Sequence, residues 1–307
     1  MRRIRYERTG GPEELFQEEV PTPEPGVGEL LVRTRAIGVT LPVVRKVRES
    51  AQPIPLGGEL AGEVVRVGEG VSGYAPGDRV TGLCFGHGYA EYALLHTTMA
   101  SPVPADATAT DAVALVRSGV VALGALEAAR TERGESVLVT AAASGVGHLA
   151  LQLARWKGAA RVVAAVGDEG KEDFARSLGA DAVVTYGQQG WGDPVDIVLD
   201  AVGGALLTPA VKALAPGGRL VAYSSGGGTI DAYDLLVGGR SAIGFQVAIV
   251  ARTQPERYAR WTRELWRLFG EGVLRPAVHA EFALADAARA HAVIEARANR
   301  GKVVLVP

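Results

Sequence analysis

The segment Ser136–Gly147 most constrains the fold, because an apolar run gives way there to small residues just before a helical pattern begins. A chain that leaves a strand and enters a helix within a few residues needs backbone conformations that glycine tolerates, and Gly145 and Gly147 provide them. Backbone N–H groups at such a helix start can hold a pyrophosphate. The G-x-G-x-x-G motif is incomplete, because Ala142 and Ser144 stand where glycines often occur. Two interpretations remain, a dinucleotide-binding turn and a plain strand-to-helix turn.

The residues that follow alternate between strand and helix patterns as far as about residue 270. Helical stretches over 149–157 and 171–178 carry apolar residues at three-to-four spacing. The strand segments between them are too uniformly apolar for a sheet that is buried on one face only. These segments are 161–166, 182–186, 195–202 and 219–224. The alternation predicts a doubly wound α/β fold with a parallel sheet, and this context favours the dinucleotide-binding turn.

Length and composition indicate an enzyme of two domains in a reducing compartment. A chain of 307 residues exceeds what one hydrophobic core usually organises. The net charge of -2 gives no basic excess, which argues against a nucleic-acid partner. Cys84 is the single cysteine, and the charged start over residues 1–8 lacks the apolar core of a signal peptide. We therefore expect a cytoplasmic protein, and no apolar run of membrane-spanning length, hence no membrane partner.

The first hundred residues follow a different pattern from the middle of the chain. Short β-favouring segments over 29–35, 59–67 and 89–95 are separated by turns rich in glycine and proline. Many short strands of this kind are typical of a small barrel. The apolar segment Lys302–Val306 near the other end of the chain could return to that barrel as a strand.

Several motifs together resemble those of the medium-chain dehydrogenases/reductases, most closely the zinc-independent quinone oxidoreductases that include zeta-crystallin. In chain order they are Gly58–Gly68, Gly77–Val80, Gly88–Tyr92, Ala142–Gly147, Leu178–Asp181 and Asp200–Gly204. The resemblance spans nearly the whole chain. It implies a GroES-like β-barrel domain from residues 1–115 and 272–307, a Rossmann dinucleotide-binding domain over 116–271, and an active-site cleft at their junction.

The sequence argues against zinc. Zinc-dependent relatives carry a cysteine and a histidine where this chain has Thr40 and Gly58, and residues 98–146 contain neither residue type. One cysteine cannot form a structural site of four. Without a Lewis acid to polarise an alcohol, hydride addition to an electron-poor acceptor remains the expected chemistry.

The second strand of the predicted sheet indicates which nicotinamide cofactor binds. An aspartate at its end would bind the ribose 2′-hydroxyl of NAD and repel a 2′-phosphate, and Gly167 stands there instead. The resemblance implies that Gly167, Lys171, Tyr186 and Arg297 surround the 2′-phosphate of NADPH. Asp168 and Glu169 oppose this prediction if they face inward, and the two cations could instead be solvated surface residues.

The remaining cofactor contacts follow the same resemblance. Their positions are Ala142, Ser144, Gly145, Val146 and Gly147 at the turn, then Val202, Ser224 and Phe245. The backbone around Phe245 is expected to contact the carboxamide of the nicotinamide.

The expected nicotinamide pocket departs from the family at Thr40, Arg45 and Val120, where relatives carry asparagine, an aromatic hydroxyl and threonine. The Thr40 hydroxyl could contact the nicotinamide ribose or a substrate oxygen. Arg45 could place positive charge near an enolate or an anionic substrate. Alternatively, Thr40 is a turn residue and Arg45 belongs to a solvated basic group, in which case solvent supplies the proton.

We predict a zinc-independent, NADPH-dependent reductase that transfers hydride to a small electrophilic acceptor, a quinone or an α,β-unsaturated ketone. Two alternatives stay open, an enoyl-thioester reductase of polyketide or fatty-acid type and a low-turnover NADPH-binding protein with a structural or regulatory role. Residues 241–249 are expected to form the last strand of the nucleotide-binding sheet and to pair with a second copy in a homodimer. The five histidines are scattered and are expected to be structural or surface residues.

Overall fold

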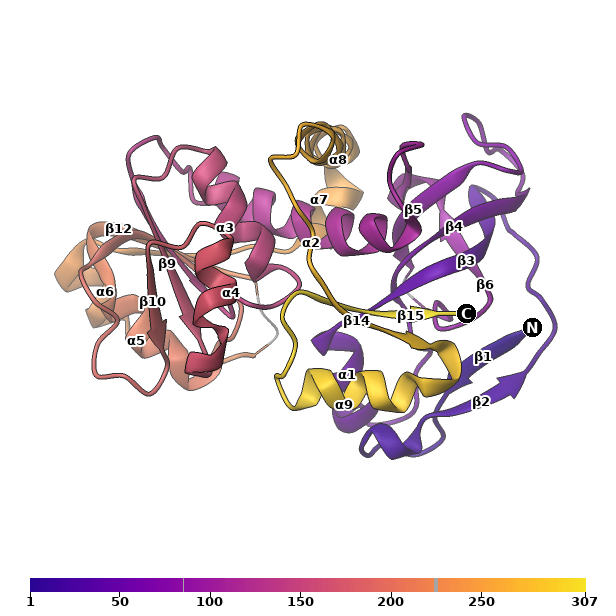
Figure 1. Cartoon of the computed structure of the whole chain (residues 1–307), viewed down its shortest axis with the longest axis horizontal. Coiled ribbons are helices and arrows are strands. Elements are labelled where there is room, and N and C mark those ends of the chain that lie inside the picture. The colour runs from indigo at the N-terminus through magenta and orange to yellow at the C-terminus, as the bar shows by residue number, and fades with distance from the viewer. Residues whose placement is uncertain (85, 224–225) are drawn as a thin grey trace. The chain divides into compact units, whose positions relative to one another are not determined.

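The computed structural model describes residues 1–84, 86–223 and 226–307 (Figure 1). They form two compact units. Unit 1 consists of Met1–Arg117 and Pro276–Pro307, and unit 2 of Ser118–Arg275. The first contains mainly antiparallel strand pairs and the second a parallel sheet covered by helices, so the predicted α/β class is confirmed.

Unit 1 is built around a sheet with the strand order β14-β15-β3-β4-β5-β7, to which β6 adds by pairing with β3. The strands are β3 (Glu29–Val39), β4 (Gly58–Val67), β5 (Arg79–Cys84), β6 (Tyr92–His96), β7 (Ala100–Pro102), β14 (Val278–Ala283) and β15 (Lys302–Val306). Among the described residues, two α-helices lie wholly within this unit, α1 (Leu41–Glu49) and α9 (Ala287–Glu295). Because β15 pairs antiparallel with β3, the predicted return of residues 302–306 to the barrel is confirmed.

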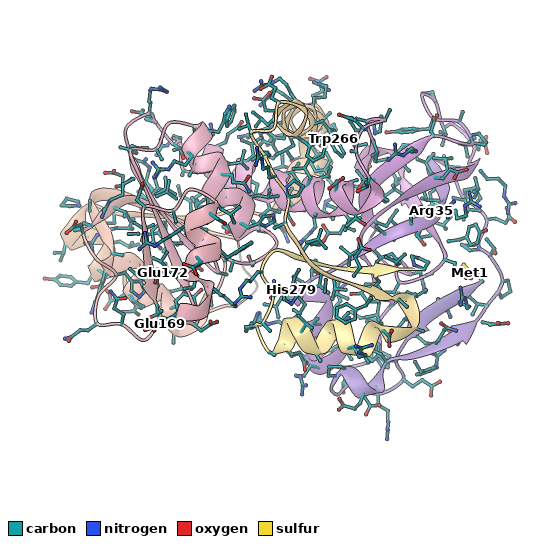
Figure 2. All side chains as sticks on the ribbon, in the orientation of Figure 1. Met1, Arg35, Glu169, Glu172, Trp266 and His279 are labelled. Carbon is teal, nitrogen blue, oxygen red and sulfur yellow. The ribbon has the colours of Figure 1, made fainter. Side chains whose placement is uncertain are left out.

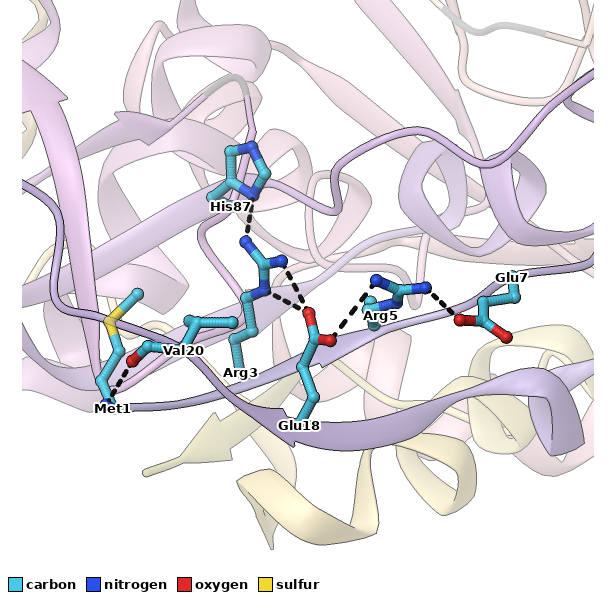
Figure 3. A network of polar contacts seen from close by, with 7 residues as sticks. All are labelled: Met1, Arg3, Arg5, Glu7, Glu18, Val20 and His87. Carbon is cyan, nitrogen blue, oxygen red and sulfur yellow. Dashed lines mark hydrogen bonds and ion pairs between the residues drawn. The ribbon is translucent and has the colours of Figure 1, made fainter.

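A separate pair of strands, β1 (Arg2–Arg5) and β2 (Phe16–Glu19), begins the chain. Glu18 lies between two arginines, accepting from Arg3 Nε at 2.6 Å and from Arg5 at 3.3 Å (Figure 3). The Arg3 guanidinium also lies 3.3 Å from His87 Nδ1. These partly exposed contacts hold the two strands together and connect them to the segment that carries His87.

Unit 2 contains a parallel sheet with the order β10-β9-β8-β11-β12-β13. The strands are β8 (Ser136–Thr140), β9 (Arg161–Val166), β10 (Ala182–Thr185), β11 (Val195–Asp200), β12 (Leu214–Ala222) and β13 (Ser241–Gly244). Numbered within the unit, the order is 3-2-1-4-5-6, which is that of doubly wound dinucleotide-binding sheets. The direction of winding reverses between β8 and β11, so ligands are expected at the carboxyl ends of these two strands.

Helices bury both faces of this sheet, which explains its uniformly apolar strands. Val137, Val163 and Val198 are almost inaccessible to solvent, although they belong to three different strands. The helices of the unit are α3 (Gly147–Trp156), α4 (Glu172–Ser177), α5 (Leu207–Lys212), α6 (Ala232–Gly238), α7 (Val247–Thr253) and α8 (Pro255–Gly270). The predicted parallel sheet covered on both faces is therefore confirmed.

The expected strand over 241–249 is wrong beyond its first four residues. β13 ends at Gly244 because its partner β12 ends at Ala222, the residue opposite Gly244 in the register. Phe245 donates one more backbone hydrogen bond to Ala222, and α7 begins two residues later. Val247 and Val250 are buried at helical spacing. The apolar run therefore contains a short edge strand and the start of a helix.

The expectation that no apolar run reaches membrane-spanning length is wrong, because helix α2 (Ala109–Ala128) is long and apolar enough. Its length and its hydropathy of 1.5 would suit a membrane span, but 78% of its most apolar window is buried inside the protein. The helix is therefore a core element of the fold. Within residues 1–84, 86–223 and 226–307 it is the one helix with these properties.

We predict that two buried histidines make the folded protein less stable in acid. Burial lowers the pKa values of His148 and His291 to about 4, from an ordinary value of 6.5. Between these pH values the unfolded chain binds more protons than the folded chain, so stability falls as the pH is lowered. We expect the two groups together to reduce the free energy of unfolding by about 4 kcal/mol between pH 7 and pH 5.

Thermal unfolding across this pH range measures the effect. The variant His148→Gln should lose about half of the pH dependence, and His96→Gln, at an exposed position, should lose none of it. Equal pH dependence in the wild-type protein and in His148→Gln would contradict this assignment.

Candidate nucleotide and acceptor site

The turn after β8 brings five predicted residues together at the start of α3, namely Ala142, Ser144, Gly145, Val146 and Gly147. A Cβ atom on Gly147 would lie 2.2 Å from the Ala141 carbonyl oxygen, so only glycine fits this close approach. The Ser144 hydroxyl accepts the Gly147 N–H at 3.0 Å. Ser144 therefore orders the turn where a glycine-rich motif would leave the backbone more freedom.

A buried carboxylate holds the turn after β11 against β8. Asp200 accepts a hydrogen bond from the Thr140 hydroxyl at 3.1 Å and from the Gly203 backbone at 2.9 Å. The Thr140 hydroxyl in turn accepts the Ala201 N–H at 2.8 Å. Burial raises the pKa of Asp200, while the hydrogen bonds that it accepts favour its charged form. The two turns at the reversal of winding are thus fixed relative to each other.

Gly167 follows β9, and Tyr186 follows β10 on the neighbouring strand. The nearest atom to a Cβ built on Gly167 would be Tyr186 Cε2, at 3.9 Å. The Tyr186 hydroxyl accepts the Ala141 N–H at 2.7 Å. The structure therefore brings Gly167 and Tyr186 together and connects them to the turn after β8, with open space at Gly167.

Lys171 lies four residues beyond Gly167, in the short 3-10 helix Glu169–Lys171 (η3) that precedes α4. Its side chain is largely buried, and its ammonium lies 3.6 Å from the carboxylate of exposed Asp168. Glu169, the other acidic residue that could oppose phosphate binding, is exposed, and Figure 2 shows it near Glu172 at the surface of unit 2. Asp168 is thus directed toward Lys171 and compensates its charge.

Thr40, Arg45 and Arg297 belong to unit 1. Thr40 is buried where β3 passes into α1, and its carbonyl accepts the N–H groups of Val43 and Val44 at 3.0 Å. Arg45 lies on α1, 3.7 Å from Glu49 one turn later. Arg297 follows α9 with a φ of 55°, a left-handed conformation that is uncommon for arginine.

Three further predicted residues follow the strands of unit 2. Val202 is half-buried in the turn that Asp200 organises. Phe245 is half-buried after β13, and its ring lies 6.1 Å from that of Trp261. Ser224 lies outside the described residues.

The described side chains offer no donor set for a metal ion. Within residues 1–84, 86–223 and 226–307, no group of three or more His, Cys, Asp or Glu side chains could hold a metal ion. The position equivalent to the zinc ligands of related dehydrogenases carries Thr40, whose hydroxyl is a poor ligand for zinc. These residues do not fit a zinc site.

Family models and relatives identify the chain. Residues 26–105 match the alcohol dehydrogenase GroES-like domain, and residues 178–305 match the zinc-binding dehydrogenase model. The quinone oxidoreductase of Rattus norvegicus is 31% identical over all of this chain and 98% of its own length. The chain belongs to the quinone oxidoreductase family of medium-chain dehydrogenases/reductases. Both the predicted family and the predicted GroES-like and Rossmann architecture are thereby confirmed.

Two other relatives differ in length, one being as long as this chain and the other much longer. The structure of Escherichia coli quinone oxidoreductase complexed with NADPH is 28% identical, covers all of both chains and has a TM-score of 0.92. The spectinabilin polyketide synthase system protein NorB of Streptomyces orinoci is 34% identical over 91% of this chain, which matches 13% of that much longer protein.

Thr140 is a residue of the site for which the sequence predicts no role. Asp200 lies in the family motif Asp200–Gly204, and Thr140 lies inside the segment Ser136–Gly147. The sequence does contain one indication of this contact. A polar residue ends each of two buried parallel strands, Thr140 in β8 and Asp200 in β11. Because such ends meet at one edge of a sheet, a contact between them could have been expected.

We predict that Thr140→Val, which keeps the shape but removes the hydroxyl, lowers the free energy of unfolding by about 1–3 kcal/mol. The change leaves the Ala201 N–H without its partner and removes one of the two donors to Asp200 Oδ1, so that only the Val202 N–H remains there. Chemical denaturation measures the loss. Thr140→Ser should keep most of the stability, and a Thr140→Val protein as stable as the wild type would contradict the role given to this hydroxyl.

Proposed function

We propose that this protein is an NADPH-dependent reductase that transfers hydride to a quinone or an α,β-unsaturated ketone without a metal ion. The observation that carries the proposal is the match to quinone oxidoreductases over the whole chain, including one whose structure contains NADPH. NADPH supplies the hydride when it is bound. The residues of this chain bind and orient the cofactor and stabilise charge on the acceptor.

The end of β9 supports a preference for NADPH over NADH. Gly167 leaves open space where an aspartate would repel a 2′-phosphate, and the Tyr186 ring borders that space. We assign Lys171 and Arg297 as the cations that neutralise the phosphate. The Asp168 carboxylate lies against Lys171 in the free protein, so binding requires that Lys171 exchange this contact for the phosphate.

The turn after β8 and the turn after β11 are proposed to hold the pyrophosphate and the nicotinamide ribose. Ala142 and Gly147 let the backbone approach closely, and Ser144, Gly145 and Val146 complete the start of α3. Val202 and Ser224 are assigned to the cofactor as well, and the backbone at Phe245 to the carboxamide. The contact of Thr140 with Asp200 fixes the first two turns before the cofactor arrives.

Thr40 and Arg45 are proposed to act on the acceptor. A Thr40 hydroxyl can donate to an oxygen on which negative charge develops, and an arginine can stabilise the same charge at longer range. Arg45 lies 3.7 Å from the exposed Glu49 carboxylate, a contact that solvent weakens by screening. Solvent is the remaining proton source if neither side chain supplies the proton.

An enoyl-thioester reductase is the second candidate, and the match to a polyketide synthase protein favours it specifically. That match covers only 13% of the longer protein, whereas the quinone oxidoreductases match from end to end. A low-turnover NADPH-binding role is the third candidate. The cytoplasmic location expected from the single cysteine belongs to the same proposal.

The test uses the purified protein with NADPH or NADH and 9,10-phenanthrenequinone, followed by absorbance of the reduced nicotinamide. We expect oxidation of NADPH and a preference for it over NADH. Turnover of an enoyl thioester but of no quinone or enone would favour the second candidate. Tight NADPH binding without oxidation of any acceptor would favour the third.

The variant Gly167→Asp tests the assigned phosphate site. The new side chain has room, so the protein should fold, and its carboxylate should raise the Kd for NADPH at least about tenfold while leaving NADH nearly unchanged. Gly270→Asp is the control, because a Cβ built on Gly270 has nothing within 4 Å. Equal affinity of Gly167→Asp and wild type for NADPH would contradict the assignment.

We also propose that two copies pair through the edge of the sheet in unit 2. β13 is the edge strand, and three of its four residues are exposed. Helix α6, which leads into β13, exposes Tyr233, Leu236 and Val237 by 67%, 75% and 69%. An apolar helix face beside an open strand edge is a surface that a second copy would cover.

Light scattering after size exclusion tests the dimer. The variant Leu236→Lys should raise the dissociation constant of the dimer at least about tenfold, because a charge would be buried in the interface. Val27→Lys, at a residue of unit 1 that is 72% exposed, should leave the dimer intact. A monomeric wild-type protein, or an unaffected Leu236→Lys dimer, would contradict the proposal.

A further inference from the structure

A buried ion pair connects the strands of unit 1. The Lys302 ammonium at the start of β15 contacts the Glu59 carboxylate of β4, and each side chain is only 2% exposed. Neither Glu59 oxygen has a hydrogen-bond partner among the other described groups. Burial by itself lowers the pKa of Lys302 to about 7, and the Glu59 charge beside it acts in the opposite direction. Apolar residues of similar volume often stabilise a core as well as such a pair does, so the pair needs another explanation.

β15 pairs on its other side with β14, but its apolar pattern does little to define its register on β3. Three residues of β15, Val303–Leu305, pair with Ile37–Val39 of β3, and both segments are buried on both faces. A strand with one polar face resists a one-residue slip, because the slip would turn its apolar side chains to solvent. Here a slip would exchange one buried apolar residue for another. The apolar pattern therefore specifies this register weakly.

Gly38 limits where the pair can form. In the β3–β4 register Gly38 lies opposite Glu59, and a Cβ atom on Gly38 would overlap the Glu59 side chain. The Glu59 carboxylate thus lies over the one position of this segment that has no side chain. Ile37 and Val39 on either side carry branched side chains, so a shifted strand would exclude Glu59 from this space.

We propose that the Glu59–Lys302 pair over Gly38 sets the register of β4, β3 and β15 and thereby positions Thr40. Thr40 directly follows Val39, and Lys302 directly precedes the Val303 that pairs with Val39. The Glu59 carboxylate over Gly38 thus lies two residues before Thr40, the last residue before α1. This inference rests on the proposed function, in which the Thr40 hydroxyl contacts the acceptor or the ribose. Glu59 and Lys302 are positioning residues in it, since they act through Thr40.

The test removes both charges together, in the double variant Glu59→Leu with Lys302→Met. Each single change leaves a buried charge alone and should lower the Tm, whereas the double variant should regain most of that loss. Despite this recovery, we expect kcat with the quinone to fall at least about tenfold, because small displacements of a reacting group are costly. The KM for NADPH should stay within about twofold, and the backbone amides of 303–305 should exchange hydrogen faster in the free protein.

A matched control exists on the same two strands. Arg33 and Glu63 lie opposite each other on β3 and β4, with an ion-pair distance of 2.8 Å and partly exposed side chains. The double variant Arg33→Leu with Glu63→Leu removes this pair. It should leave both kcat and the exchange of 303–305 unchanged, since β3 and β4 are still held by the Glu59–Lys302 pair.

Two results would overturn the inference. If the Glu59→Leu, Lys302→Met protein shows wild-type kcat and wild-type exchange, the pair in the wild-type protein only adds stability. A reduced kcat without faster exchange at 303–305 means that the pair does not act through the register. If the wild-type protein itself turns over no acceptor, the proposed function fails, and the exchange rates alone then decide whether the pair sets the register.

Discussion

The nucleotide-binding unit depends on the contact between Thr140 and Asp200. Parallel strands place their carboxyl ends at one edge of the sheet, and the reversal of winding leaves the ends of β8 and β11 side by side there. A buried carboxylate at this point needs donors, and the Thr140 hydroxyl and two backbone N–H groups supply them. One buried polar cluster thus fixes both turns that are proposed to hold the cofactor.

Recognition of the two ends of NADPH uses different physical means. At the phosphate end, the proposed selectivity comes from the missing side chain at Gly167 together with a cation whose charge Asp168 compensates in the free protein. At the acceptor end, the proposed groups are Thr40 at a strand-to-helix junction and Arg45 one turn into α1. Neither end offers a donor set for zinc among the described side chains, so electrostatics and positioning carry the proposed catalysis.

The agreement between sequence and structure follows the strength of each local signal. β9 and β15 have the predicted bounds, because their apolar runs end abruptly at polar residues or glycine. Residues 241–249 were assigned wrongly as one strand, since a short apolar run does not show where a strand loses its partner. Helix α2 was not predicted as an apolar run of spanning length, because Asp111, Arg117 and Glu127 interrupt its apolar sequence.

The sequence by itself determined the fold class, the family, the glycine-bearing turn and the glycine at the end of the second strand, because these depend on local pattern and on residue type at a fixed spacing. Only the tertiary structure decided which distant side chains meet. Three contacts show this. The Tyr186 hydroxyl bonds to the Ala141 N–H, 45 positions earlier, and Asp200 bonds to Thr140, 60 positions earlier. Lys302 contacts Glu59, 243 positions earlier. Such contacts depend on strand order and register, and no local pattern encodes either of them.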